Sequence, residues 1–178
     1  MTQKAIFLDR DGTINEDLGY IYKKEDLVFI KDSLKSLKIL QKHFNLYIIT
    51  NQSGIGKNIF TEEDFIKFNN YFLDALKKEG IIIKKVYYCK HKNEDNCICK
   101  KPSTYFVDKI IKEDNISRSL SYVIGDHPHD VVMGINAGIK SIYLLSGHGK
   151  KHLNELDCLP DYIASNLYEA TKFIIRKK

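Results

Sequence analysis

Two aspartates separated by a single residue form the first cluster in this sequence that could do chemistry. Asp9 and Asp11 follow directly on the apolar residues 5–8, and Gly12 comes next. A carboxylate attacks phosphorus usefully when a hard cation screens the charge repulsion, and two carboxylates at this spacing can offer oxygens to Mg²⁺. We therefore predict Asp9 as a nucleophile towards a phosphoryl group and Asp11 as its general acid and base. The alternative is a strand-end turn that uses Asp and Gly for backbone reasons.

Three further polar groups also follow predicted strands or precede a helix. The hydroxyls, amides and backbone N–H groups of residues 50–53 could hold phosphate oxygens, or form an ordinary polar loop. Lys101 could neutralise phosphate charge and orient Asp9, although a surface lysine is the default. Asp126 could complete a magnesium shell, with Asp130 orienting Lys101 or a water, and the alternative is a helix start with Asp caps.

Three cysteines and a histidine lie within eleven residues: Cys89, His91, Cys97 and Cys99. Three thiolates and an imidazole suit tetrahedral zinc and leave no coordination position for water, which favours a structural site that fixes a polar loop. A disulfide framework would not gather its cysteines in this way in a cytoplasmic chain. The alternative, unrelated thiols beside a surface histidine, is disfavoured because residues 92–96 offer no hydrophobic environment.

The remaining cysteine and three of the histidines have no such neighbours in sequence. We predict that Cys158 is a small buried residue. His43, His148 and His152 are predicted to lie on the surface.

Short apolar runs alternate with longer amphipathic stretches along the chain. Strands are predicted at residues 5–8, 46–49, 85–88, 120–124, 142–145 and 162–164. Helices are predicted at residues 34–44, 61–78, 104–113, 130–137 and 167–175, the second capped by Thr61 and ended by Gly80. This alternation implies an α/β fold, a Rossmann-like three-layer sandwich with a mostly parallel sheet, in which ligands bind beyond the carboxyl ends of the strands. Every polar cluster that follows a strand falls at that edge.

Length and composition are those of one ordinary globular domain. The 178 residues, of which 43% are hydrophobic, predict a single domain over residues 1–178. No apolar run approaches the ~20 residues of a membrane span, and the N-terminal apolar stretch is too short for a signal peptide, so we expect a cytoplasmic protein without a membrane partner. The net charge of +5 is spread along the chain and is compatible with a phosphorylated substrate.

The order and spacing of these motifs are more specific than any one of them. A strand followed by DxDGT, a strand followed by Thr50, a lysine before a helix, and a strand followed by GDxxxD resemble the haloacid dehalogenase (HAD) superfamily over nearly the whole chain. The resemblance implies Asp9 as nucleophile, Asp11 as general acid and base, and Thr50 and Lys101 as phosphate contacts. It also implies Mg²⁺ bound by Asp9, Asp126 and the backbone carbonyl of Asp11.

Within that superfamily, one family of sugar bisphosphate phosphatases is most similar. The segments FLDRDGTIN, DLGY, TNQSGIG, YYCKHK and CICKKP resemble the D-glycero-D-manno-heptose 1,7-bisphosphate 7-phosphatases. This implies removal of the 7-phosphate and retention of the 1-phosphate, on the route to nucleotide-activated heptose for lipopolysaccharide or capsule. The residues that would face substrate are Asp17, Leu18, Gly19, Tyr20, Thr50, Asn51, Gln52, Ser53, Lys100, Lys101 and His127.

Three positions depart from the pattern of that family. Lys100 stands where arginine is usual, and a lysine cannot make the bidentate fork to phosphate. His127 stands where lysine is usual, and it carries its charge only partly at neutral pH. The glycine-rich segment reads GIGKN and not GIARG. We expect substrate affinity or the choice of anomer to differ accordingly.

Neither long connection has space for a separate cap domain. About fifty residues separate Thr50 from Lys101, and a helix, a strand and the zinc loop use them. About twenty separate Asp11 from the first predicted helix. We therefore expect a capless enzyme that recognises a small, charged sugar phosphate through loops of the core, and a monomer.

Three rival functions compete with this interpretation. Histidinol-phosphate phosphatase is a close relative with the same zinc loop, but that branch tends to carry Asp where this chain has Ser53. A nucleic-acid end phosphatase is compatible with the basic charge and eleven tyrosines, but no stripe of Lys and Arg interleaved with aromatics is present, so no nucleic-acid partner is expected. A zinc-stabilised interaction protein without catalysis is disfavoured because every catalytic position is filled.

Overall fold

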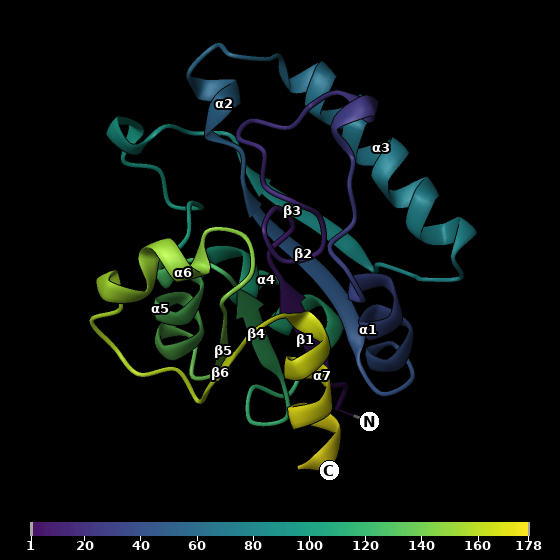
Figure 1. Ribbon diagram of the computed structural model, residues 1–178. Helices are drawn as coiled ribbons and strands as arrows, with labels where there is room; N and C mark the ends of the chain where they lie inside the picture. The colour runs from purple at the N-terminus through teal and green to yellow at the C-terminus, as the bar shows by residue number, and fades with distance from the viewer. Residues whose placement is uncertain (1, 178) are drawn as a thin grey trace.

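A six-stranded parallel sheet forms the centre of the protein in a computed structural model that describes residues 2–177 (Figure 1). The strand order is β3-β2-β1-β4-β5-β6, and each neighbouring pair is parallel. The strands are β1 (Ala5–Leu8), β2 (Asn45–Asn51), β3 (Lys85–Cys89), β4 (Tyr122–Gly125), β5 (Lys140–Leu144) and β6 (Tyr162–Ala164). The predicted strands are confirmed, with ends that differ by at most two residues.

The five predicted helices are also present, together with two short ones. The helices are α1 (Ser33–Leu40), α2 (Ser53–Gly56), α3 (Glu62–Lys78), α4 (Tyr105–Asp114), α5 (Pro128–Asn136), α6 (Gly149–His152) and α7 (Leu167–Arg176). Helices α2 and α6 were not predicted, because four residues are too few to show a helical period. Helix α5 begins at Pro128 and not at Asp130, since proline at the first helical position costs no hydrogen bond.

The helices cover both faces of the sheet. On one face, α1, α3 and α7 pack their buried side chains, such as Leu37, Phe72 and Ile174, against β-strand residues such as Ile6 and Ile48. On the other face, α4 and α5 pack against the alternate residues of the same strands. Helices on both faces confirm the predicted three-layer α/β sandwich. The strands are apolar throughout because both of their faces are buried.

Helix α3 begins with the predicted cap. The Asp64 backbone N–H donates to Thr61 Oγ1 at 3.1 Å, and the Thr61 backbone N–H donates to Asp64 Oδ2 at 3.0 Å. Gly80 follows the helix with a φ of 73°, which a residue with a Cβ adopts only under strain. The cap fixes where α3 starts, and with it the position of Phe65 and Phe68, which are buried under the loop after β1.

Strand β1 lies at the point where the strand order reverses. The chain runs outward from β1 to β2 and β3, and then returns to the other side of β1 as β4. The loops after β1 and β4 therefore diverge, which opens a crevice at the carboxyl edge of the sheet. Within residues 2–177 the connections consist of helices and loops and include no separate cap. No helix in that range combines the length and apolar character needed to cross a membrane.

Candidate active site

A cavity of about 480 Å³ lies at this carboxyl edge. It is lined by residues that follow β1, β2, β3 and β4, as the position of the polar clusters after those strands predicts. The predicted residues found there are Asp9, Asp11, Asp17, Gly19, Tyr20, Thr50, Asn51, Gln52, Ser53, Lys100, Lys101, Asp126 and His127. Leu18 is 64% exposed and does not line the cavity. Four lining residues were not predicted: Lys57, Asn93, His129 and His148.

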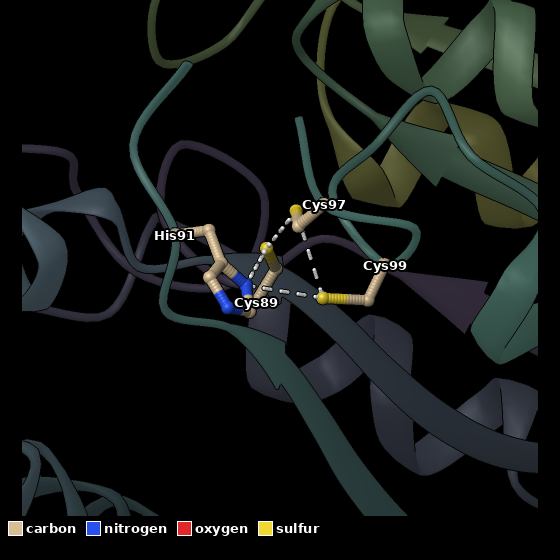
Figure 2. Close-up of side chains that lie close together, drawn as sticks. All are labelled: Cys89, His91, Cys97 and Cys99. Atoms are coloured by element: carbon tan, nitrogen blue, oxygen red, sulfur yellow. Dashed lines mark hydrogen bonds between the residues drawn. The ribbon is translucent and has the colours of Figure 1, made fainter. Parts of the chain in front are cut away.

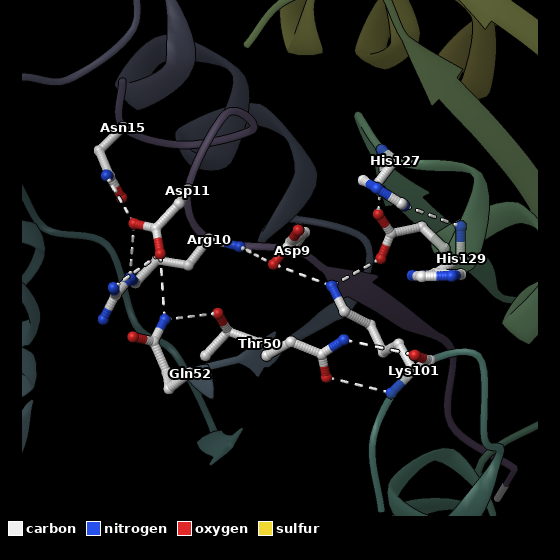
Figure 3. Close-up of polar contacts among 11 residues, drawn as sticks. Asp9, Arg10, Asp11, Asn15, Thr50, Gln52, Lys101, His127 and His129 are labelled. Atoms are coloured by element: carbon white, nitrogen blue, oxygen red, sulfur yellow. Dashed lines mark hydrogen bonds and ion pairs between the residues drawn. The ribbon is translucent and has the colours of Figure 1, made fainter. Parts of the chain in front are cut away.

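Lys101 is the buried cation of the cavity (Figure 3). Its Nζ lies 2.9 Å from Asp9 Oδ1 and 2.7 Å from Asp130 Oδ1, and its backbone N–H donates to Asn51 Oδ1 at 3.0 Å. Burial opposes the charged amine, but the two carboxylates outweigh burial and raise the pKa of Lys101. The lysine therefore stays protonated and holds Asp9 in one orientation.

Three carboxylates crowd around this single lysine. Ligand oxygens of Asp9, Asp126 and Asp130 all lie within 4.8 Å of one another. Burial is the main cause that raises the pKa of Asp9 to about 7 and that of Asp126 to about 8, and the neighbouring carboxylates add to it. Such an excess of buried negative charge and of oxygen donors fits a hard divalent cation.

The three carboxylates differ in how far protein donors already occupy their oxygens. Asp130 accepts from Lys101 Nζ and, through Oδ2 at 3.2 Å, from the His127 backbone N–H. It lies at the third position of α5, where its side chain caps the helix start. Asp130 is thus occupied in orienting Lys101, and Asp9 and Asp126 are the side chains available to Mg²⁺.

Asp11 points into a cage of donors and not towards Asp9. Its Oδ1 accepts from Arg10 Nε and from Asn15 Nδ2, each at 2.9 Å, and its Oδ2 accepts from Arg10 Nη2 at 2.7 Å and Gln52 Nε2 at 3.0 Å. Burial raises the pKa of Asp11, but Arg10 and the hydrogen bonds outweigh burial, so the pKa is lowered. To protonate a leaving group, Asp11 must take up a proton from solvent as it exchanges some of these hydrogen bonds for one to substrate.

Arg10 is a residue of the site that sequence reasoning missed. Its side chain is completely buried, and its guanidinium carbon lies 5.5 Å and 4.9 Å from the ring centroids of Phe65 and Phe68 on α3. A charge between two aspartates suggests a solvated turn, and only the buried rings of α3 show that the side chain points into the protein. The helix thereby fixes the donor that holds Asp11.

The loop after β2 is fixed from several sides. Gln52 Nε2 donates to Thr50 Oγ1 at 2.9 Å, and the Gln52 backbone N–H donates to the Cys89 carbonyl at 2.7 Å. A Cβ on Gly54 would lie 2.2 Å from the Phe60 ring and 2.8 Å from the Tyr20 ring, so only glycine fits there. This close approach packs Tyr20 against the loop.

The predicted zinc ligands converge on one point (Figure 2). Cys89 Sγ lies 3.6 Å from His91 Nδ1 and 3.5 Å from Cys97 Sγ, and Cys99 Sγ lies 3.5 Å from His91 Nδ1 and 3.8 Å from Cys97 Sγ. A tetrahedral ion with metal–sulfur bonds of ~2.3 Å has ligand-to-ligand edges of about 3.7 Å. The four side chains therefore fit a closed tetrahedral zinc site.

Four histidines gather at the rim, and one prediction about them is corrected. His148 is exposed, as predicted, and it also lines the cavity, where its backbone N–H donates to Asp126 Oδ2 at 2.8 Å. His152, also predicted on the surface, is half-buried with its ring 4.8 Å from that of His127. Burial first, and His129 second, lower the pKa of His127 to about 4, so its ring is neutral near pH 7. Cys158 was predicted to be buried and is only half-buried.

Comparisons with known proteins agree with this geometry. A family model described as HAD-hydrolase-like matches residues 98–170. A D-glycero-beta-D-manno-heptose-1,7-bisphosphate 7-phosphatase of Helicobacter pylori is 41% identical over 82% of this chain and 84% of its own length. A D-glycero-alpha-D-manno-heptose-1,7-bisphosphate 7-phosphatase of Campylobacter jejuni is 38% identical over 85% of this chain and 87% of its own.

A solved structure shares the fold of nearly the whole chain. It is the D,D-heptose 1,7-bisphosphate phosphatase of B. bronchiseptica, complexed with magnesium and phosphate. The two chains superpose with a TM-score of 0.89, at 23% identity, over 98% of this chain and 99% of the other.

Proposed function

We propose how the cavity works from the family to which this chain belongs. That family is the D-glycero-D-manno-heptose-1,7-bisphosphate 7-phosphatases, within the HAD superfamily. The enzyme is a phosphoric monoester hydrolase that removes the 7-phosphate of D-glycero-D-manno-heptose 1,7-bisphosphate, in the biosynthesis of nucleotide-activated heptose. The observation that carries this proposal is Asp9, fixed by the buried Lys101 beside a second carboxylate, Asp126, at the switch point of the sheet.

The side chains around Asp9 supply each step of a two-step hydrolysis. An Asp9 oxygen attacks the phosphorus, and the bond from phosphorus to the sugar oxygen breaks while Asp11 gives that oxygen a proton. Asp11, now ionised, takes a proton from water, and the resulting hydroxide attacks the phospho-aspartate, releasing inorganic phosphate and free Asp9. Lys101 and Thr50 offset charge on the phosphoryl oxygens throughout. Mg²⁺ held by Asp9, Asp126 and the Asp11 carbonyl would screen the repulsion between carboxylate and phosphate.

The cysteine loop completes the proposal. We assign zinc to Cys89, His91, Cys97 and Cys99 as a structural ion, because all four positions are filled by protein. The loop leads directly into Lys100 and Lys101, so the ion would hold two cavity lysines in place. Residues 1–178 then act as one catalytic domain, with loops of the core recognising the substrate.

Ser53 favours the sugar phosphate over a cationic substrate such as histidinol phosphate. A second carboxylate at this position would attract an amine, whereas Ser53 lines the cavity with a neutral hydroxyl. The cavity also presents Lys57 and Lys100, which would repel an amine and attract a second phosphate. A bisphosphate is therefore the better match to the charge of the cavity.

Phosphate release with Mg²⁺ from both anomers of the heptose bisphosphate, and from histidinol phosphate, tests the proposal. Wild type should turn over a heptose anomer best, and Asp9→Asn should lower the rate by about 10³-fold or more, because the nucleophile is lost. Asp74→Asn, on the exposed surface of α3, is the matched control and should keep the wild-type rate. Best turnover of histidinol phosphate would overturn the substrate assignment, and an active Asp9→Asn would overturn the mechanism.

A further inference from the structure

Two lysines of the cavity carry a charge that no carboxylate neutralises at ion-pair distance. Lys57 Nζ donates to the Tyr20 hydroxyl at 3.0 Å, and Lys100 donates to the Asn93 side-chain carbonyl, both neutral acceptors. Among residues 2–177, neither lysine has a carboxylate oxygen within 4.0 Å, whereas Lys101 has two. Lys57 and Lys100 are thus the cavity lysines whose charge is available to an anion.

Lys57 is held by the chain around it. It follows α2, where its backbone N–H donates to the Ser53 carbonyl at 3.0 Å. The preceding Gly56 N–H donates to the Lys90 carbonyl at 2.9 Å, and a Cβ on Gly56 would lie only 2.8 Å from that oxygen. The turn is therefore hydrogen-bonded to the segment that leads from β3 into the cysteine loop, and the exposed ammonium of Lys57 lies at the cavity.

The proposed substrate carries two phosphates, and the buried end of the cavity serves only one. The 7-phosphate must lie at Asp9, and Lys101 is already shared between Asp9 and Asp130. The retained phosphate must therefore find its cations elsewhere in the cavity. A phosphate oxygen adds charge–charge attraction to the hydrogen bond from the ammonium, so Lys57 gains by exchanging the neutral Tyr20 hydroxyl for phosphate.

We propose that Lys57 is a specificity-determining residue that binds the phosphate the enzyme does not hydrolyse, with the Tyr20 hydroxyl holding the ammonium when the site is empty. This inference rests on the proposed bisphosphatase function. The retained phosphate is the same in the ground state and in the transition state, so Lys57 contributes uniform binding. Its loss should raise KM and leave kcat unchanged.

The test compares Lys57→Met with wild type on the heptose 1,7-bisphosphate and on the heptose 7-phosphate that lacks the second phosphate. A hydrogen bond to a charged group accounts for about 10- to 100-fold in affinity, so KM for the bisphosphate should rise by about 10-fold or more. KM for the monophosphate and both kcat values should stay within about 2-fold, and Lys57→Arg should restore a low KM. Lys78→Met, at the exposed end of α3, is the matched control.

Each result supports or overturns the assignment. A Lys57→Met enzyme that keeps the wild-type KM for the bisphosphate would overturn the role of Lys57 while the proposed function stood. An equal rise of KM for both substrates would place Lys57 at the wrong phosphate and would also overturn it. If wild type hydrolyses no heptose bisphosphate, the proposed function fails together with this inference.

Discussion

The loop after β1 shows how one buried arginine can orient Asp11, the carboxylate that we propose as general acid and base. Arg10 contributes two of the four hydrogen bonds to Asp11, and α3 encloses its guanidinium with two aromatic rings. Asp11 is therefore held in one orientation before substrate arrives, and we infer that Arg10 acts as a positioning residue that does not touch the reacting atoms.

We expect Arg10→Lys to lower kcat by about 10-fold or more, because a lysine cannot make the bidentate fork that orients Asp11. A merely structural role would leave the pH profile unchanged. With the guanidinium gone, the pKa of Asp11 should rise, so the limb of the kcat profile that reports it should move to higher pH. Rate measurements across pH on wild type and Arg10→Lys test this positioning role, and urea unfolding checks that the variant folds. A pH profile of kcat that does not move would contradict the positioning role.

The site residues that could be predicted from the sequence are those whose position depends only on their neighbours along the chain. Asp9 and Asp126 follow β1 and β4 directly and Thr50 lies near the end of β2, so their position at the carboxyl edge follows from the parallel sheet. His148 reaches the site through a hydrogen bond to Asp126, a residue 22 positions earlier, and no local pattern marks such a contact. The orientation of Asp11 likewise depends on α3, a separate element.

At the scale of the element, the cysteine loop joins the outer strand β3 to two lysines of the cavity. Cys89 ends β3, and the proposed zinc ligands Cys97 and Cys99 come just before Lys100 and Lys101. Between them lie a single 3-10 turn and polar residues that bury little apolar surface. With zinc bound as proposed, such a loop would depend on its four ligands for its conformation.

Cys97→Ser should therefore impair the site more than the core. We expect kcat to fall and KM to rise, together by about 10-fold or more in kcat/KM, because Lys101 and Lys100 lose their support. Far-UV circular dichroism should stay close to wild type, since the sheet is packed independently of the loop. Cys158→Ser, outside the quartet, is the matched control, and zinc content is measured on both. Unchanged kinetics in a zinc-free Cys97→Ser would contradict a supporting role for the loop.

The elements themselves were predictable where they are long and amphipathic. Helix α3 shows its apolar face, its Thr61 cap and its terminal Gly80 in the sequence. Helices α2 and α6 have four residues each and arise from packing of the loops around the site. The starting point of α5 also escaped prediction, because His127 and not an aspartate occupies the cap.

At the scale of the whole molecule, the site is a concentration of buried charge at the edge of an otherwise apolar sheet. The pKa values of Asp9 and Asp126 are raised in the fold, to about 7 and about 8, above the usual value of 3.8. Between about pH 4 and about pH 8 the folded protein keeps protons on these two carboxyls that the unfolded chain has lost. This contribution to stability is fully present below about pH 4 and is lost as the pH rises through 7 to 8. His127, whose pKa is lowered to about 4 in the fold, reduces the stability only below about pH 6.5, where the unfolded chain takes up its proton.

Without magnesium, the free energy of unfolding should therefore fall by about 1 kcal/mol between about pH 7 and about pH 8.5, as both carboxylates ionise side by side. Added Mg²⁺ should stabilise the protein more at the higher pH, because only ionised carboxylates bind the ion. Urea unfolding at both pH values, with and without Mg²⁺, measures both effects. Asp126→Asn should flatten the pH dependence and weaken the response to the ion. A wild-type stability that is level or rises with pH would show that these carboxylates are not coupled in the fold.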